Sequence, residues 1–85
     1  MKKVTLKEML EELTECILEN KKQPNYFWRT EYIEGSAMYL PIVQVDLMRG
    51  RFITINDDFS EYEWELKDSR IYKATTEKEG VKDER

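Results

Sequence analysis

Aromatic residues and arginines are the side chains of this 85-residue chain that are best suited to bind a ligand. Tyrosine joins a flat stacking face to a polar tip, and the planar guanidinium of arginine suits phosphate and pyrophosphate groups. Both kinds meet early in the chain, because Arg29 directly follows three aromatic residues. We therefore take Arg29 as a candidate anion contact and four aromatic residues as ligand candidates: Tyr26, Trp28, Tyr32 and Tyr39.

The other aromatic and basic residues of the central region have plainer interpretations. Arg49 and Arg51 flank a glycine in a hairpin pattern, where exposed charge is the usual interpretation, although arginine beside an aromatic face also suits a nucleotide. The remaining bulky aromatic residues are expected to pack against a helix: Phe27, Phe52, Phe59 and Trp64.

Several chemistries are excluded by composition. The chain has no histidine and one cysteine, so it lacks an imidazole base, a Ser-His-Asp triad, a Cys/His zinc site and an internal disulfide. Its glycines are isolated, so no glycine-rich loop is present to hold phosphates. We predict a protein that is not an enzyme, with no catalytic residues, bound metal or cofactor. Side chains and strand-end amides would hold any ligand.

Charge and hydropathy limit the kinds of partner that the chain can bind. A net charge of -4 and an isoelectric point near 4.9 disfavour nonspecific binding to nucleic acid or to an anionic membrane. No apolar run approaches a signal core or a membrane-spanning helix. We expect a cytoplasmic protein with no direct nucleic-acid or membrane partner, in which Cys16 stays reduced and packs as a small hydrophobe.

An acidic stretch covers residues 57–68, where six carboxylates are opposed by Lys67 alone. Such a stretch is usually a solvated face. It does not fit a calcium loop, whose glycine and ligand spacing are missing. A third interpretation is that it imitates a phosphate backbone and occupies the nucleic-acid channel of another protein.

The elements that position these residues begin with a helix. Thr5-Leu6-Lys7-Glu8 matches a capping box, and apolar residues then recur at spacings of three and four as far as Ile17. The lysines at 21 and 22 suit the negative end of a helix, and Pro24 blocks its continuation, which predicts an end near residues 20–22.

After Pro24 the apolar period changes to two. We predict strands at residues 26–33, 37–46 and 51–55, with a hairpin turn at residues 47–50. A turn at residues 58–60 should precede a strand from Tyr62 onward, and residues 70–73 form a further short strand. In the first strand, Trp28 and Thr30 share one side, whereas Arg29 shares the other side with Phe27.

These elements predict an α+β fold: one N-terminal amphipathic helix packed on an antiparallel meander sheet of four or five strands. A single domain should cover residues 1–74. Residues 75–85 carry one apolar side chain among many charges, so we expect a disordered charged tail. So short a chain supplies a thin core, and we therefore expect a homo-oligomer, a dimer or a tetramer.

The order of segments resembles that of the small bacteriophage proteins of the Thoeris anti-defence sponge family. Members run from a short helix through Gly-Lys-Lys to an Arg-x-x-Trp strand, a Met-Tyr-Leu-like strand, an Asp-Gly hairpin and an acidic stretch with tryptophan. In this chain Tyr32 stands in the place of the strand tryptophan. The matching segments are Asn20-Lys21-Lys22, Arg29-Thr30-Glu31-Tyr32, Met38-Tyr39-Leu40, Arg49-Gly50 and residues 58–66.

The resemblance implies a noncatalytic counter-defence protein that sequesters a cyclic nucleotide immune signal, an isomer of cyclic ADP-ribose, at a subunit interface. For such a ligand we assign base stacking to Tyr32 and Tyr39, with Trp28 as the alternative platform. We expect Arg29, and secondarily Arg51, to contact the phosphates. We expect Asn56 to contact the ribose or the edge of the base.

Two other functions stay open. Relatives are also known as inhibitors of CRISPR nucleases, so the chain is alternatively an acidic inhibitor that binds a host defence nuclease directly through residues 57–68. A structural or regulatory phage protein with no small ligand is equally compatible with the sequence.

Overall fold

The predicted capping box forms and starts helix α1 (Leu6–Leu18) in the computed structural model of this chain. The Thr5 hydroxyl accepts the N–H of Glu8 at 3.1 Å, and the Glu8 carboxylate accepts the N–H of Thr5 at 2.9 Å. The structure describes residues 1–31 and 34–75. Tyr32, Ile33 and residues 76–85, which include most of the predicted tail, lie outside that description.

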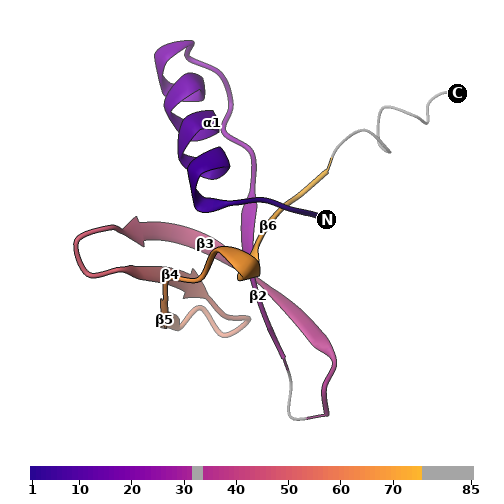
Figure 1. Ribbon diagram of the computed structural model, residues 1–85. Coiled ribbons are helices and arrows are strands. Elements are labelled where there is room, and N and C mark those ends of the chain that lie inside the picture. Colours follow the sequence, from indigo (N-terminus) through magenta and orange to yellow (C-terminus); the bar gives the residue numbers. More distant parts are fainter. Residues whose placement is uncertain (32–33, 76–85) are drawn as a thin grey trace, which may run out of the picture.

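The described strands form one antiparallel sheet in the order β1-β6-β2-β3-β4-β5 (Figure 1). This confirms the predicted α+β class, with slightly more strands than the four or five expected. The additional strand is β1, which precedes the helix and is too short for a sequence pattern. The strands are β1 (Lys2–Lys3), β2 (Tyr26–Glu31), β3 (Ala37–Asp46), β4 (Arg51–Ile55), β5 (Glu61–Glu65) and β6 (Ile71–Lys73).

Strands β2 to β5 form the predicted meander, whereas the last strand returns to its beginning. A single 3-10 turn, η1 (Asp68–Arg70), brings the chain back so that β6 pairs with β2. Phe27 then lies opposite Tyr72 on one side and opposite Pro41 of β3 on the other. The N- and C-terminal parts of the domain are therefore joined through the same sheet.

The sheet is folded over at β3. The first half of this ten-residue strand pairs with β2 and the second half with β4, with a register shift between Ile42 and Gln44. In a flat sheet β2 and β5 would lie about 14 Å apart, three strand spacings. Instead Trp28 of β2 and Trp64 of β5 stack with ring centroids 6.2 Å apart. A β-bulge of this kind bends the strand that carries it.

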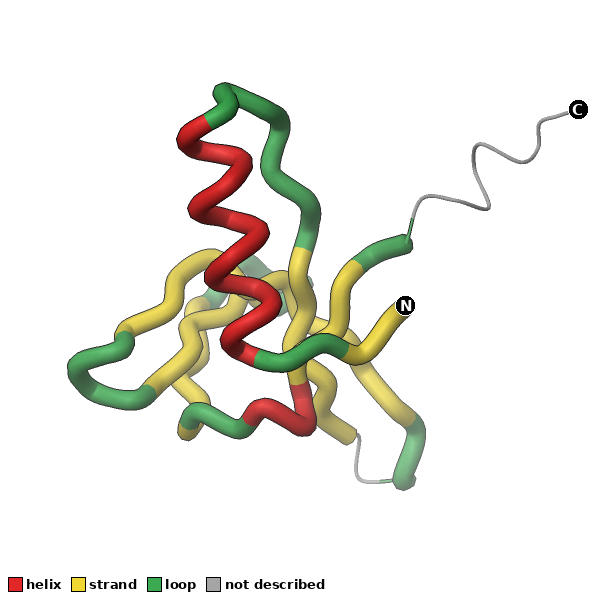
Figure 2. Tube along the Cα trace, turned by 45° about the horizontal axis from the view of Figure 1, so that its top comes forward, coloured by secondary structure: helices red, strands yellow, loops and turns green. Residues whose placement is uncertain are grey.

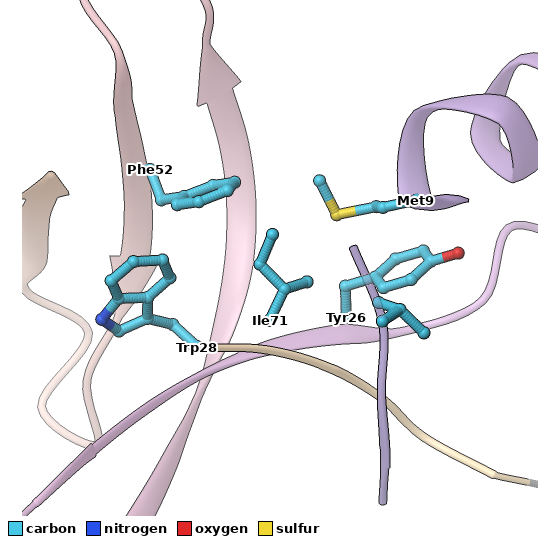
Figure 3. Close-up of a cluster of buried hydrophobic side chains, with 6 residues drawn as sticks. Met9, Tyr26, Trp28, Phe52 and Ile71 are labelled. Carbon is cyan, nitrogen blue, oxygen red and sulfur yellow. The ribbon is translucent and has the colours of Figure 1, made fainter. Parts of the chain in front are cut away.

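The core lies between the bent sheet and the helix. Met9 from α1 meets Tyr26, Trp28, Phe52 and Ile71 from three strands, as Figure 3 shows. Figures 1 and 2 show the helix standing over one face of the sheet, with its C-terminal end projecting beyond the strands. Tyr26 and Trp28 are both buried and flank the less buried Phe27, which confirms the predicted alternation in this strand. The sides are the reverse of those expected: Tyr26, a ligand candidate, lies in the core, and Phe27, expected to pack against the helix, is not part of the core cluster.

A polar contact ties the helix to the sheet. The Tyr26 hydroxyl donates to the carboxylate of Glu12, and the Lys73 ammonium lies 2.7 Å from the same carboxylate. These two donors, Lys73 foremost, lower the pKa of Glu12. Burial, reinforced by the neighbouring carboxylate, raises the pKa of the Tyr26 hydroxyl. The helix is thus held by a charge-assisted network as well as by Met9.

Two local expectations were wrong. The helix ends at Leu18 rather than near residues 20–22, because Asn20 takes a left-handed conformation (φ 56°) and Lys21 donates its N–H back to the Cys16 carbonyl at 2.9 Å. This pattern is a Schellman end. Phe59 does not pack against the helix: it is 84% exposed in the turn before β5, with φ 66°. Cys16 is buried, as expected.

Among the described residues, no helix combines the length and the apolarity needed to cross a membrane.

Candidate functional site

The six residues predicted to bind a ligand do not converge on one place in the fold. Two of them meet on the outer face of the sheet, and two others line a hollow on the inner side. Asn56 lies in a turn, and Tyr32 is outside the described residues.

The first arrangement is a cross-strand pair. Arg29 of β2 lies directly opposite Tyr39 of β3, and opposed residues of an antiparallel pair point to the same face. Because the flanking Trp28 is buried, this face is turned away from the core. We call Arg29 and Tyr39 the outer-face pair.

Both members of the outer-face pair are accessible. The ring of Tyr39 is 37% exposed and contacts Tyr72 edge to face, with ring centroids 5.3 Å apart. The Arg29 side chain is 33% exposed, and its guanidinium lies 3.5 Å from the Glu31 carboxylate, a long contact that an anionic ligand can replace. An aromatic platform and a partly free guanidinium therefore stand side by side.

The sequence reasoning missed Tyr72 as part of this face. Because Tyr72 follows buried Ile71 in a strand, the alternation of side chains predicts that it faces away from the core. Its neighbours on that face, however, depend on the return of β6 beside β2. That pairing joins segments more than forty residues apart in the chain, as the register Phe27 to Tyr72 shows. Sequence patterns predict strands, and they do not predict such pairings.

The second arrangement is a hollow of about 360 Å³ between β2, β5 and η1, which we call the rim pocket. It contains two predicted site residues, Trp28 and Arg51. The Arg51 Nε lies 3.9 Å from a Glu63 carboxylate oxygen. The pocket is lined by Trp28, Thr30, Arg51, Glu63, Trp64, Glu65, Lys67 and Arg70.

Burial changes the role available to Trp28. Its side chain is 2% exposed and its ring packs on Phe52, with centroids 4.8 Å apart, and on Trp64. The expectation that Trp28 is an alternative stacking platform is therefore wrong, because a core position leaves no ring face for a base. Trp28 nevertheless lines the rim pocket, and its buried indole N–H has no hydrogen-bond partner among the described residues.

Asn56 has a structural role in the turn between β4 and β5. Its N–H donates to the Ser60 carbonyl at 3.0 Å, and its carbonyl accepts the N–H of Phe59 at 2.9 Å. Arg51 begins β4 and Asn56 follows its end, so the two lie roughly 17 Å apart along the strand. Asn56 is thus separated from the rim pocket.

The acidic stretch divides into parts with different roles. The Asp58 carboxylate accepts both the hydroxyl and the N–H of Ser60, and these hydrogen bonds lower the pKa of Asp58. Asp68 accepts a helix N–H. Asp57 is exposed in the turn before β5, and the other three carboxylates, Glu61, Glu63 and Glu65, alternate along β5 and are exposed. These three form a row on an edge strand of the sheet.

A further hollow, an apolar groove of about 690 Å³, lies between α1 and β3. Leu10 and Leu13 form its helical wall and Val43 and Val45 its strand wall. We call it the helix groove. Within residues 1–31 and 34–75, no three cysteine, aspartate or glutamate side chains are grouped to hold a metal ion.

Comparison of the chain with protein-family models, with curated proteins and with solved structures gave no match. The resemblance of residues 5–66 to the Thoeris anti-defence sponges therefore stays an expectation. The positions of the chain's own side chains carry the functional interpretation.

Proposed function

We propose that this chain is a noncatalytic binding protein that sequesters a small anionic nucleotide. The observation that carries the proposal is the outer-face pair, in which Arg29 stands directly opposite the exposed ring of Tyr39. The sequence resemblance selects isomers of cyclic ADP-ribose, an immune signal, as the ligands to test first. Such a protein would act in the cytoplasm of a phage-infected cell.

Binding at this pair needs no base or nucleophile. The Tyr39 ring stacks on adenine, and the Arg29 guanidinium donates to a phosphate oxygen in place of its long contact with Glu31. A protein that holds the signal below the concentration needed by the downstream effector blocks the response by mass action alone. The absence of histidine does not impair this mechanism.

The energies of these two contacts indicate that the binding site is shared between two subunits. Stacking of one base contributes about 1–3 kcal/mol, and a hydrogen bond to a charged group about 1.5–3 kcal/mol. Their sum falls short of the roughly 8 kcal/mol that micromolar affinity requires. An outer face covered by a second copy would exclude water and add contacts. We therefore propose that the protein is a homo-oligomer.

Exposed apolar side chains at the end of α1 and on β3, apart from the outer-face pair, offer a further surface for self-association. Ile17 and Leu18 at the end of α1 are 66% and 79% exposed, and Val43 on the strand wall is 52% exposed. Contiguous apolar surface of this kind marks interaction sites. Light scattering should give a molar mass above the 10.3 kDa of one chain. Leu18→Glu should reduce the measured molar mass to that of one chain. Met48→Glu, at the tip of the β3–β4 hairpin, should leave the molar mass unchanged.

Ligand binding is tested with cyclic ADP-ribose isomers and cyclic dinucleotides. We expect one of them to raise the melting temperature and to be recovered intact after heat denaturation. Tyr39→Ala and Arg29→Gln should each weaken binding by about tenfold, since each removes about 1.4 kcal/mol or more. The controls are Tyr62→Ala and Arg49→Gln, which change exposed residues away from the outer face. A chemically altered nucleotide would indicate an enzyme, and no response to any nucleotide would remove the proposal.

The row of carboxylates on β5 supports a second candidate, direct inhibition of a defence nuclease. Glu61, Glu63 and Glu65 point to one side of an edge strand at a spacing of roughly 7 Å. This function predicts a 1:1 complex with the nuclease that weakens with salt. It should be abolished by charge reversal at Glu61 and Glu63 and should tolerate Tyr39→Ala, the reverse of the pattern expected for a nucleotide sponge.

A further inference from the structure

The indole N–H of Trp28 is a buried donor without an acceptor among the described residues. The side chain is 2% exposed, and its Nε1 has no hydrogen-bond partner. The neighbouring tryptophan differs, since Trp64 donates its Nε1–H to the hydroxyl of Thr54 at 2.8 Å. Buried donors are nearly always paired in folded proteins. The unpaired N–H of Trp28 therefore calls for an acceptor from outside the chain.

The Trp28 side chain lines the rim pocket, but its Nε1 is itself covered, so a ligand oxygen reaches the N–H only when the side chains at the pocket wall move apart. Figure 3 shows its nitrogen on the side of the ring away from Ile71 and Met9. An indole nitrogen donates and does not accept. A ligand that satisfies it must present a lone pair.

The charges around the pocket favour an anion. Three cationic side chains, Arg51, Lys67 and Arg70, line it together with the carboxylates of Glu63 and Glu65. The local charge is therefore +1 within a chain whose net charge is -4. A single negative charge on a ligand would balance it.

These cations differ in how far they are already engaged. Arg51 lies 3.9 Å from Glu63, and one Arg70 nitrogen donates to the Arg29 carbonyl at 3.0 Å. Lys67 forms no ion pair with any described residue. Its ammonium is thus the cation most available to a ligand, and the second nitrogen of the Arg70 fork can serve beside it.

We propose that the rim pocket is a binding site for a singly charged oxyanion, a carboxylate or a phosphodiester. The Trp28 N–H donates to one of its oxygens, and Lys67 and Arg70 supply the compensating charge. Buried N–H donors and cations converging in one hollow are the ordinary means of anion recognition. Because Arg29 and Trp28 point to opposite faces of β2, this site is separate from the outer-face pair.

The test follows the two indole N–H signals of the ¹⁵N-labelled protein by NMR. Trp64→Phe assigns them. Sodium acetate and sodium dimethyl phosphate are titrated in separate arms, with sodium chloride as the reference. We expect at least one of the two anions to move the Trp28 signal along a saturable curve, and to move the Trp64 signal less, because the Trp64 N–H is already bonded to Thr54; the arm that saturates identifies the chemistry. If the Trp28 signal shifts in both anions only as much as in sodium chloride, neither anion binds the N–H, and the proposal is overturned.

Matched charge variants test the role of Lys67. Lys67→Ala should raise the dissociation constant about twofold to fivefold, as expected for loss of one exposed ion pair. Lys7→Ala makes the same change of net charge on the exposed side of α1 and should leave the constant unchanged. Equal effects of the two variants would contradict a local site. Tyr39→Ala should not alter the response, so failure of the nucleotide proposal and failure of this one are distinguishable.

Discussion

The carboxylate of Asp68 accepts the backbone N–H of Leu6 at 3.1 Å, a contact between residues 62 positions apart. Leu6 begins α1 and Asp68 begins η1. The first amides of a helix have no partner within it, and here Asp68 serves one of them while Thr5 serves another. The same turn that returns β6 to β2 therefore also anchors the start of the helix.

Removal of this contact should destabilise the domain. Asp68→Ala is expected to lower the free energy of unfolding by about 1 kcal/mol, because it loses a helix cap and a negative charge at the positive end of the helix dipole. Urea unfolding followed by circular dichroism measures the change. Asp68→Asn keeps an acceptor oxygen and should retain most of the stability; equal losses in the two variants would show that the hydrogen bond is not what matters.

Acid should loosen the helix through Glu12. Lys73 and then Tyr26 lower the pKa of this carboxyl, so the folded state releases its proton more readily than the unfolded chain does. The stabilisation is therefore complete above about pH 4.5, the ordinary value for glutamate, and is lost as the pH falls through the lowered pKa. Unfolding free energies measured on both sides of this range should show the fall.

A neutral variant isolates this contribution. Glu12→Gln should flatten the dependence of stability on pH in the acid range, because the amide does not titrate. Glu11→Gln makes the same substitution on the neighbouring exposed position. If both variants follow the acid profile of the unmodified protein, the contact of Glu12 with Lys73 and Tyr26 has no influence on stability.

Two phenylalanines that the sequence pattern assigned to the same packing role should respond oppositely to truncation. Phe52 has 0% of its surface exposed and packs on Trp28, so Phe52→Ala should cost about 3–5 kcal/mol, enough to unfold much of so small a domain. Phe59 is 84% exposed, and Phe59→Ala should change stability by no more than about 0.5 kcal/mol. Thermal melts of the two variants decide the matter.

The buried Thr54 should be needed for its oxygen rather than its shape. It is fully buried and accepts the indole N–H of Trp64. Thr54→Val keeps the volume but leaves this partly buried donor unpaired, which should cost about 1–3 kcal/mol. In the double variant with Trp64→Phe the donor is absent, so the further effect of Thr54→Val should nearly vanish. Additive losses in this double-mutant cycle would contradict the assignment.

Much of the fold could be predicted from local patterns. The capping box at Thr5, the strand bounds at residues 37–46 and 51–55 and the turn before β5 all agree with the structure. Each depends on a few adjacent residues whose propensities and spacing act over one turn or one strand. The helix end was misjudged because a left-handed Asn20 ended it before the lysines and Pro24 had any effect.

The candidate site was predicted less well, because it depends on pairings between distant segments. The residue types were sufficient to select Arg29 and Tyr39, but the register of β2 on β3 made them neighbours. The same sequence reasoning selected Trp28 for its ring, and the bend of the sheet at β3 then buried that ring against Phe52. Lys67 and Arg70 carried no local signal of a site.

The amino-acid sequence by itself determined the helix, the strands, the alternation of side chains along them and the lack of imidazole chemistry, since all of these follow from residue type and short-range period. Only the tertiary structure decided that β6 returns beside β2, that the sheet folds over at β3, and that a tryptophan with an unpaired indole N–H lines a hollow together with three cations. Those outcomes arise from packing the whole core at once, in which side chains from the helix and from several strands bury one another.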